Sequence, residues 1–119
     1  MSIKSEAFIQ QEVINKLLLH GWAVMRINGM NVSGVRSYLC YPSMPTIVKG
    51  AADIIAMHGT TCILVEVKTL NGKLSVDQMR YQKWCLAYGL DYRVITDADE
   101  LTVEDFSSER IIKPRKARP

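Results

Sequence analysis

Apolar positions along the chain recur with the two periods that distinguish helices from strands. Between Ser5 and His20 they repeat roughly every four residues, and the stretch closes at Gly21, a residue that often ends helices. A second stretch with helical spacing runs from Ser75 to Gly89, and a shorter one follows the last apolar run. We therefore predict helices over residues 5–20, 75–88 and 98–106.

Runs rich in β-branched and aromatic residues lie between these helices, which indicates strands over residues 22–27, 36–41, 54–57, 62–67 and 90–95. The third and fourth runs flank Gly59 and Thr60, which we interpret as a two-residue hairpin turn in which the glycine supplies a positive φ. The strand, helix and strand at the end of this order predict a parallel pair with a right-handed crossover. The predicted fold class is α/β, with a mixed β-sheet flanked by helices in a single domain.

The composition is that of an ordinary globular domain, with 48% apolar and 23% charged residues in 119. No apolar run approaches the roughly 20 residues that span a bilayer, and the first residues do not resemble a signal peptide. The three cysteines are odd in number and lack the spacing of a zinc site, which indicates reduced thiols. We therefore expect a cytoplasmic protein without a membrane segment.

The net charge of +3 is concentrated at the end of the chain. Residues 113–119 contain four basic side chains and no acidic one, which leaves 11 basic and 12 acidic side chains in the remainder. A basic tail suits a polyanion such as nucleic acid, although a solvated terminus explains it equally well. We therefore predict a domain over residues 1–112 and a basic, flexible tail over residues 113–119.

The predicted hairpin turn fixes which residues oppose each other, and it places Asp53 opposite Glu66. Directly opposed side chains have Cβ atoms about 4.5–5.5 Å apart, a separation at which like charges are destabilising. Lys68 follows Glu66 by two residues, so it shares the same face. Two carboxylates and an amine on one face of an apolar hairpin favour a metal site. The alternative is that Asp53 is a solvated residue at a strand end and that Glu66 and Lys68 form an exposed ion pair.

Each flanking helix contributes a polar residue near this face. Glu6 lies at the N-terminal end of the apolar stripe of the first helix, whereas Glu12 falls toward solvent. Gln78 borders the inward face of the second helix. Each residue also has a simpler explanation, since Glu6 could complement the helix dipole and Gln78 could complete a capping box with Ser75.

A pair of opposed carboxylates suits Mg²⁺ or Mn²⁺, because hard divalent cations bind through one or two carboxylates together with substrate phosphate oxygens. Such ions supply much of what phosphodiester hydrolysis requires, namely an oriented water and neutralisation of charge on the phosphoryl oxygens. Lys68 could orient the attacking water or offset charge on the phosphate. Glu6 could bind a second metal ion or fix a metal-bound water.

The order of these motifs resembles that of a known nuclease superfamily. Gly50-Ala51-Ala52-Asp53, followed by Glu66-Val67-Lys68, is similar to the Asp…Glu-x-Lys core of the restriction-endonuclease-like (PD-(D/E)XK) nucleases. More narrowly, the chain resembles small stand-alone VRR-NUC domains of the kind carried by phages. The motifs that carry this resemblance are Glu6 with Ile9-Gln10, Gly-x-x-Asp-Ile at 50–54, Glu-Val-Lys-Thr at 66–69 and Gly-Lys-Leu-Ser-x-x-Gln at 72–78. It departs from the family at Ala52, where proline is frequent, and in a longer segment over residues 30–48.

The resemblance implies a metal-dependent endonuclease that hydrolyses DNA, selects branched or Holliday-type junctions and acts as a homodimer without an organic cofactor in a bacterial or phage-infected cell. It implies the active-site set Glu6, Asp53, Glu66, Lys68 and Gln78. The implied metal ligands are Asp53, Glu66, Glu6 and the carbonyl of Val67. We expect DNA contacts from Arg26, Asn28, Lys73 and Ser75. The alternative is a nucleic-acid-binding module with the same fold that does not cut.

Overall fold

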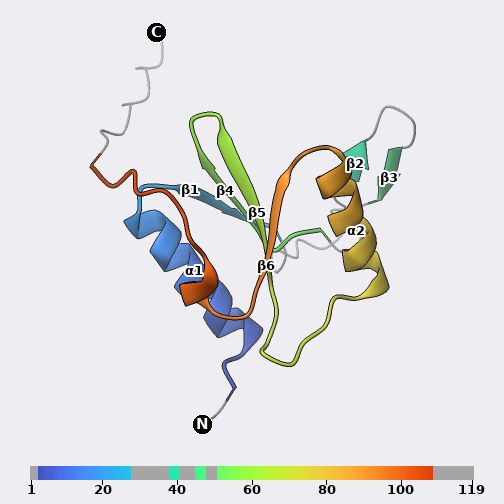
Figure 1. The fold of residues 1–119 in the computed structure, drawn as a ribbon, viewed down its shortest axis with the longest axis horizontal. Helices are drawn as coiled ribbons and strands as arrows, with labels where there is room; N and C mark the ends of the chain where they lie inside the picture. The colour runs from blue at the N-terminus through green and yellow to red at the C-terminus, as the bar shows by residue number, and fades with distance from the viewer. Residues whose placement is uncertain (1–2, 28–37, 41–44, 48–50, 109–119) are drawn as a thin grey trace, which may run out of the picture.

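The computed structural model describes residues 3–27, 38–40, 45–47 and 51–108, and Figure 1 shows their arrangement. In chain order the elements are α1 (Glu6–Leu19), β1 (Ala23–Arg26), β2 (Tyr38–Cys40), β3 (Pro45–Ile47), β4 (Ile54–His58), β5 (Thr61–Val67), α2 (Val76–Ala87), β6 (Asp91–Ile95) and a 3₁₀ turn, η1 (Ala98–Glu100). Four strands form one sheet in the order β1-β4-β5-β6, and β2 pairs with β3 in a separate two-stranded sheet.

The four-stranded sheet is mixed, because β1, β4 and β5 pair antiparallel whereas β5 and β6 run parallel. Helix α2 connects the parallel strands, as the strand-helix-strand pattern predicted. Helix α1 lies on one side of the sheet and α2 on the other (Figure 1). The predicted fold class, α/β with a mixed β-sheet flanked by helices, is confirmed.

The central hairpin has the predicted register. His58 pairs with Thr61 and Ile54 pairs with Val65, so the two-residue turn at Gly59 and Thr60 is confirmed. Gly59 has a φ of 58°, which is the left-handed conformation that the first position of such a turn requires.

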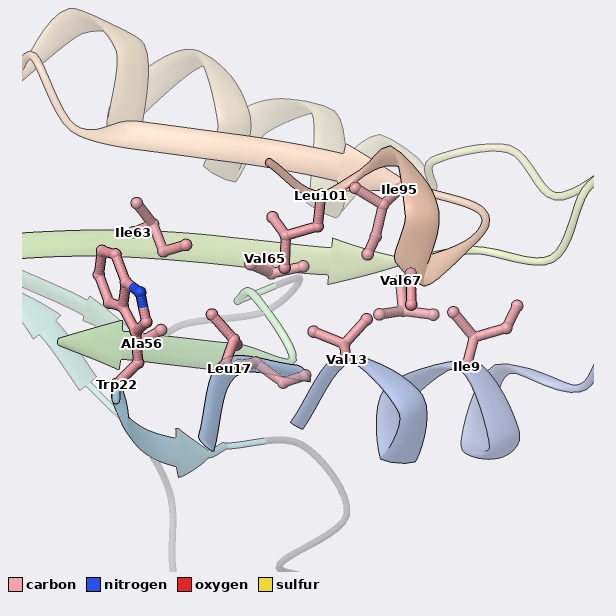
Figure 2. Packing of buried hydrophobic residues seen from close by; sticks show 12 residues of the cluster. Ile9, Val13, Leu17, Trp22, Ala56, Ile63, Val65, Val67, Ile95 and Leu101 are labelled. Carbon is pink, nitrogen blue, oxygen red and sulfur yellow. The ribbon is translucent and has the colours of Figure 1, made fainter. Parts of the chain in front are cut away.

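The alternation of side chains along β5 divides the core into two clusters, one on each face of the sheet. Val65 and Val67 pack against α1, and Figure 2 shows Ile9 and Val13 of that helix pointing toward them. Leu64 lies on the opposite face with residues of α2 and β6. Because the last five residues of β5 are all buried, this strand is covered on both faces, which is typical of a central strand.

Both helices begin where the sequence predicted. The Ser5 hydroxyl accepts a hydrogen bond from the Phe8 N–H and caps α1. Helix α1 ends before Gly21, whose φ is 88°. A Cβ atom at Gly21 would lie 2.6 Å from the backbone of Phe106, so both conformation and space demand glycine there.

The predicted helix over residues 98–106 is wrong. Among the described residues of this segment only η1 is helical. Residues 101–106 form no helix or strand, and Leu101, Val103 and Phe106 pack against the core. Side chains from elsewhere hold this segment's carbonyl groups, since Arg93 donates to the Thr102 carbonyl and the Trp22 indole donates to that of Glu104. These tertiary bonds replace the hydrogen bonds that a helix would make. The predicted strand within residues 36–41 is present as β2, whereas β3, which begins at Pro45, was not predicted.

Candidate active site

The candidate active site lies where β4 begins and β5 ends. Asp53 immediately precedes β4 and Glu66 is the penultimate residue of β5, so the two follow the hairpin ladder outward from its last pair, Ile54 with Val65. Both carboxylates are buried, with 6% of Asp53 and 1% of Glu66 exposed. Two acidic side chains at this depth need a specific partner, because burial of unpaired charge is strongly unfavourable.

Asp53 is held from two sides. Its backbone carbonyl accepts a hydrogen bond of 2.8 Å from the Ile27 N–H, at the end of β1. Its carboxylate oxygen Oδ2 accepts a bond of 2.9 Å from the buried N–H of Val67 in β5. Asp53 therefore connects the end of β1 to the end of β5, and the bond from Val67 fixes the direction of its carboxylate.

Glu66 has one satisfied and one unsatisfied carboxylate oxygen. Oε1 accepts a hydrogen bond of 2.5 Å from the Gln78 amide. Oε2 is buried and has no hydrogen-bond partner among the described residues. Burial foremost, and then the neighbouring Asp53 carboxylate, raise the pKa of Glu66 to about 8, while the positive charge of Lys68 acts in the opposite direction. An acid in this state favours either a proton or a cation beside it.

Gln78 makes hydrogen bonds both to the start of its own helix and to Glu66. Its side-chain Oε1 accepts a bond of 2.8 Å from the Ser75 N–H, and its own N–H donates to the Ser75 hydroxyl over 3.1 Å, which completes the predicted capping box. Its Nε2 is the donor to Glu66. The start of α2 is thereby tied to the acidic pair on the sheet.

Lys68 follows directly after β5 and lies beside the acidic pair. Its backbone N–H donates to the Ile95 carbonyl over 2.9 Å, which anchors this segment against β6. Its side chain is partly exposed, and its charge acts on Glu66. The structure therefore brings together four of the five predicted active-site residues: Asp53, Glu66, Lys68 and Gln78.

Glu6 is the residue that the structure does not add to this group. It is the first residue of α1 and is partly buried. Helix α1 packs on the face of Val67, whereas Glu66 points to the opposite face. Among the residues that the structure describes, no three His, Cys, Asp or Glu side chains lie together as a metal-binding group.

The donor set at Asp53 and Glu66 nevertheless fits a hard divalent cation. Mg²⁺ commonly takes one or two protein carboxylates and completes its shell with water and substrate oxygens. The unpartnered Oε2 of Glu66 and the raised pKa of that residue indicate excess negative charge that a cation would neutralise. The N–H of Val67 is already bonded to Asp53, and the role of its carbonyl as a ligand stays a prediction.

The predicted DNA contacts occupy different positions around the site. Arg26 is exposed at the end of β1 and pairs with Ile54, next to Asp53. Lys73 is exposed in the loop between β5 and α2, and Ser75 uses its hydroxyl to cap α2. Asn28 lies outside the described residues, as does the basic tail over 113–119.

A residue that the sequence interpretation assigned only to a strand also lies near the acidic pair. Tyr92 in β6 pairs with Leu64, which places it on the same face as Glu66. It is 8% exposed, and its hydroxyl has no hydrogen-bond partner among the described residues. Burial and then the charge of Glu66 raise the pKa of Tyr92. The parallel register of β5 and β6 was the signal that could have located it.

A hollow of about 390 Å³ lies at the other end of the sheet, where β5 and β6 begin. It contains none of the predicted active-site residues. Its lining residues are Trp22, Thr61, Ile63, Asp91, Arg93, Thr102, Val103 and Glu104.

One solved structure resembles this chain. It is a Holliday junction resolvase, Hjc, from the hyperthermophilic archaeon Archaeoglobus fulgidus, with a TM-score of 0.44 and 23% sequence identity. The similarity covers 72% of this chain and 63% of the resolvase. No protein-family model matches the sequence, and no curated protein matches it. Within the described residues, no helix is long and apolar enough to cross a membrane.

Proposed function

We propose that this protein is a metal-dependent endonuclease that hydrolyses phosphodiester bonds of DNA with Mg²⁺ or Mn²⁺. The observation that supports this proposal is the buried pair Asp53 and Glu66, one carboxylate oxygen of which has no partner among the described residues. Placing two acids together in a low-dielectric site costs stability unless a proton or a cation compensates. A cation bound between the two carboxylates compensates this cost, which is why the pair supports a metal site.

Within the proposal, Asp53 and Glu66 hold the cation, the Val67 carbonyl is a further ligand, and Glu6 fixes a metal-bound water from outside this group. The bound cation would neutralise negative charge on the phosphate and help to generate the attacking nucleophile. Lys68 offsets further charge on the phosphate and orients the attacking water. Gln78 keeps the Glu66 carboxylate in a fixed direction through its hydrogen bond to Oε1.

The substrate we propose is branched or Holliday-type junction DNA, bound by a homodimer that presents two active sites. The proposal of this substrate and of the homodimer is supported by the resemblance of the motifs to VRR-NUC domains of the PD-(D/E)XK superfamily. On the same ground we propose a cytoplasmic location in a bacterial or phage-infected cell. Arg26 is exposed opposite Ile54, next to Asp53, and Lys73 is exposed in the loop between β5 and α2; both supply positive charge for phosphate contacts.

Cleavage of labelled DNA tests the proposal. We expect the wild-type protein to cut at least one of four substrates, namely a four-way junction, a flap, a nicked duplex and a linear duplex, when Mg²⁺ or Mn²⁺ is present, and none with EDTA. Asp53→Asn and Glu66→Gln should each lower the rate by roughly 100-fold or more, because each removes a charge at the cation site.

Glu12→Gln is the matched control, since Glu12 is a partly exposed carboxylate that pairs with Lys4 on the outside of α1. It should cut at the wild-type rate. Cutting by Asp53→Asn at the wild-type rate would remove that residue from the mechanism. Binding of DNA without cutting in either metal would favour the non-cleaving module instead, and matched RNA substrates would reveal a ribonuclease.

A further inference from the structure

Two buried oxygen atoms near the acidic pair have no hydrogen-bond partner among the described residues, and they belong to side chains on the same face of the sheet. One is Oε2 of Glu66 and the other is the hydroxyl of Tyr92. Both side chains are more than nine-tenths buried. Buried polar groups are paired in the great majority of cases, so two unpaired oxygens in one small site call for a common explanation.

The register of the parallel strands places these two side chains as diagonal neighbours. Tyr92 lies opposite Leu64, and Glu66 lies two residues farther along β5, opposite Val94. Diagonal neighbours on adjacent strands are about 7–8 Å apart at the backbone, a separation that an aromatic side chain can bridge. The charge of Glu66 is also near enough to Tyr92 to disfavour ionisation of its hydroxyl, so Tyr92 stays a donor.

The ring of Tyr92 is held in place by α2. It packs against Tyr81 with 5.9 Å between ring centroids, at an interplanar angle of 56°. Tyr81 interacts with the buried thiol of Cys85. Of these two neighbouring tyrosines, Tyr92 is the one whose hydroxyl is buried without a hydrogen-bond partner among the described residues.

We propose that Tyr92 is a positioning residue of this site, and that its hydroxyl donates through one bridging water to Oε2 of Glu66. The hydroxyl and the carboxylate oxygen provide the two polar partners that a buried water needs. Gln78 then holds one oxygen of Glu66 and Tyr92 holds the other, so the carboxylate cannot rotate away from the cation. The inference rests on the proposed metal-dependent function.

Substitution of the hydroxyl alone tests this role. In Tyr92→Phe we expect the dissociation constant for Mn²⁺, measured by isothermal titration calorimetry on metal-free protein, to rise by about 10-fold or more, as is usual when a residue that orients a metal ligand is lost. The urea midpoint of the metal-free protein should fall, because the variant loses the water-mediated bond and leaves Oε2 of Glu66 unpaired. If the Tyr92 ring only packs, phenylalanine preserves that packing, so the midpoint should stay the same or rise and the Mn²⁺ affinity should not change.

Tyr81→Phe is the matched control, since it removes a hydroxyl from the neighbouring ring, and its Mn²⁺ affinity should stay within about 2-fold of wild type. An equally small change in Tyr92→Phe would overturn the inference and leave the nuclease proposal standing. A wild-type protein that neither binds Mn²⁺ nor cuts DNA would overturn both.

A second measurement uses the wild-type protein and does not depend on how well a variant folds. In protein labelled with ¹³C at the ring Cζ of tyrosine, addition of Mg²⁺ should shift the Tyr92 resonance, because the hydroxyl is coupled to Glu66. The resonance of Tyr88, which is exposed on α2, should not move. Absence of a shift at Tyr92 under saturating Mg²⁺ would overturn the inference.

Discussion

Glu66→Gln should make the metal-free protein more stable at alkaline pH, where the wild-type residue carries a buried charge. Glutamine has nearly the same shape as glutamate and keeps an oxygen for the Gln78 amide. It also offers an N–H toward Asp53, where the wild type has two carboxylates in contact. The substitution therefore removes the charge and preserves the packing.

The size of the effect follows from the pKa of Glu66, which rises from 4.5 to about 8 because of burial and Asp53. At about 1.4 kcal/mol per pKa unit this corresponds to about 5 kcal/mol, and solvent screening near the end of the sheet reduces it to about 2–4 kcal/mol. Because the folded protein holds this proton more tightly than the unfolded chain, stability is greatest below pH 4.5. It falls as the pH rises from 4.5 to about 8.

Urea unfolding in EDTA at pH 5, 6.5 and 8 measures this difference. The free energy of unfolding of Glu66→Gln minus that of wild type should be about 1 kcal/mol or less at pH 5 and reach about 2–4 kcal/mol at pH 8. For Glu12→Gln the difference should stay below about 1 kcal/mol at every pH, since Glu12 forms a surface ion pair. A difference for Glu66→Gln that does not change with pH would refute the reasoning.

Three further variants separate the roles of other residues. Gln78→Ala should lower the free energy of unfolding by about 1–2 kcal/mol in urea titrations and also slow DNA cleavage. Ser75→Ala should lower the free energy of unfolding by a similar amount but cut DNA faster than Gln78→Ala, because the contact between Gln78 and Glu66 survives. Equal cutting by both variants would contradict the role of Gln78 in holding Glu66. Glu6→Gln should reduce turnover while Glu12→Gln should not, and the reverse result would show that the predicted inward face of the first helix is wrong. Truncation after Ile112 removes four basic residues and should weaken DNA binding and flatten its dependence on salt in fluorescence anisotropy, whereas unchanged binding would indicate a solvated terminus.

Local signals in the sequence were sufficient to predict the central hairpin and the start of α2. The glycine at position 59 specifies a two-residue turn, and the turn then specifies every pair along the hairpin, including the approach of Asp53 to Glu66. The capping box at Ser75 and Gln78 likewise follows from four consecutive residues. Features of this kind are predictable because the interacting groups are close in sequence.

The errors occur where distant parts of the chain decide the outcome. The segment after Asp97 has helical spacing, but long-range hydrogen bonds from Trp22 and Arg93 hold the carbonyls of Glu104 and Thr102 that a helix would use. The position of Tyr92 beside Glu66 depends on the register of β5 with β6, which no local pattern specifies. The place of Glu6 depends on how α1 crosses the sheet, and helical phase alone does not determine that.

A crystal structure with Mn²⁺ tests the central claim most directly, because the anomalous signal of manganese locates the ion independently of any assumption about its ligands. We expect an anomalous peak about 2.1 Å from a carboxylate oxygen of Asp53 and from one of Glu66. A peak elsewhere, or none in crystals grown at saturating Mn²⁺, would contradict the claim that these two buried carboxylates form the metal site.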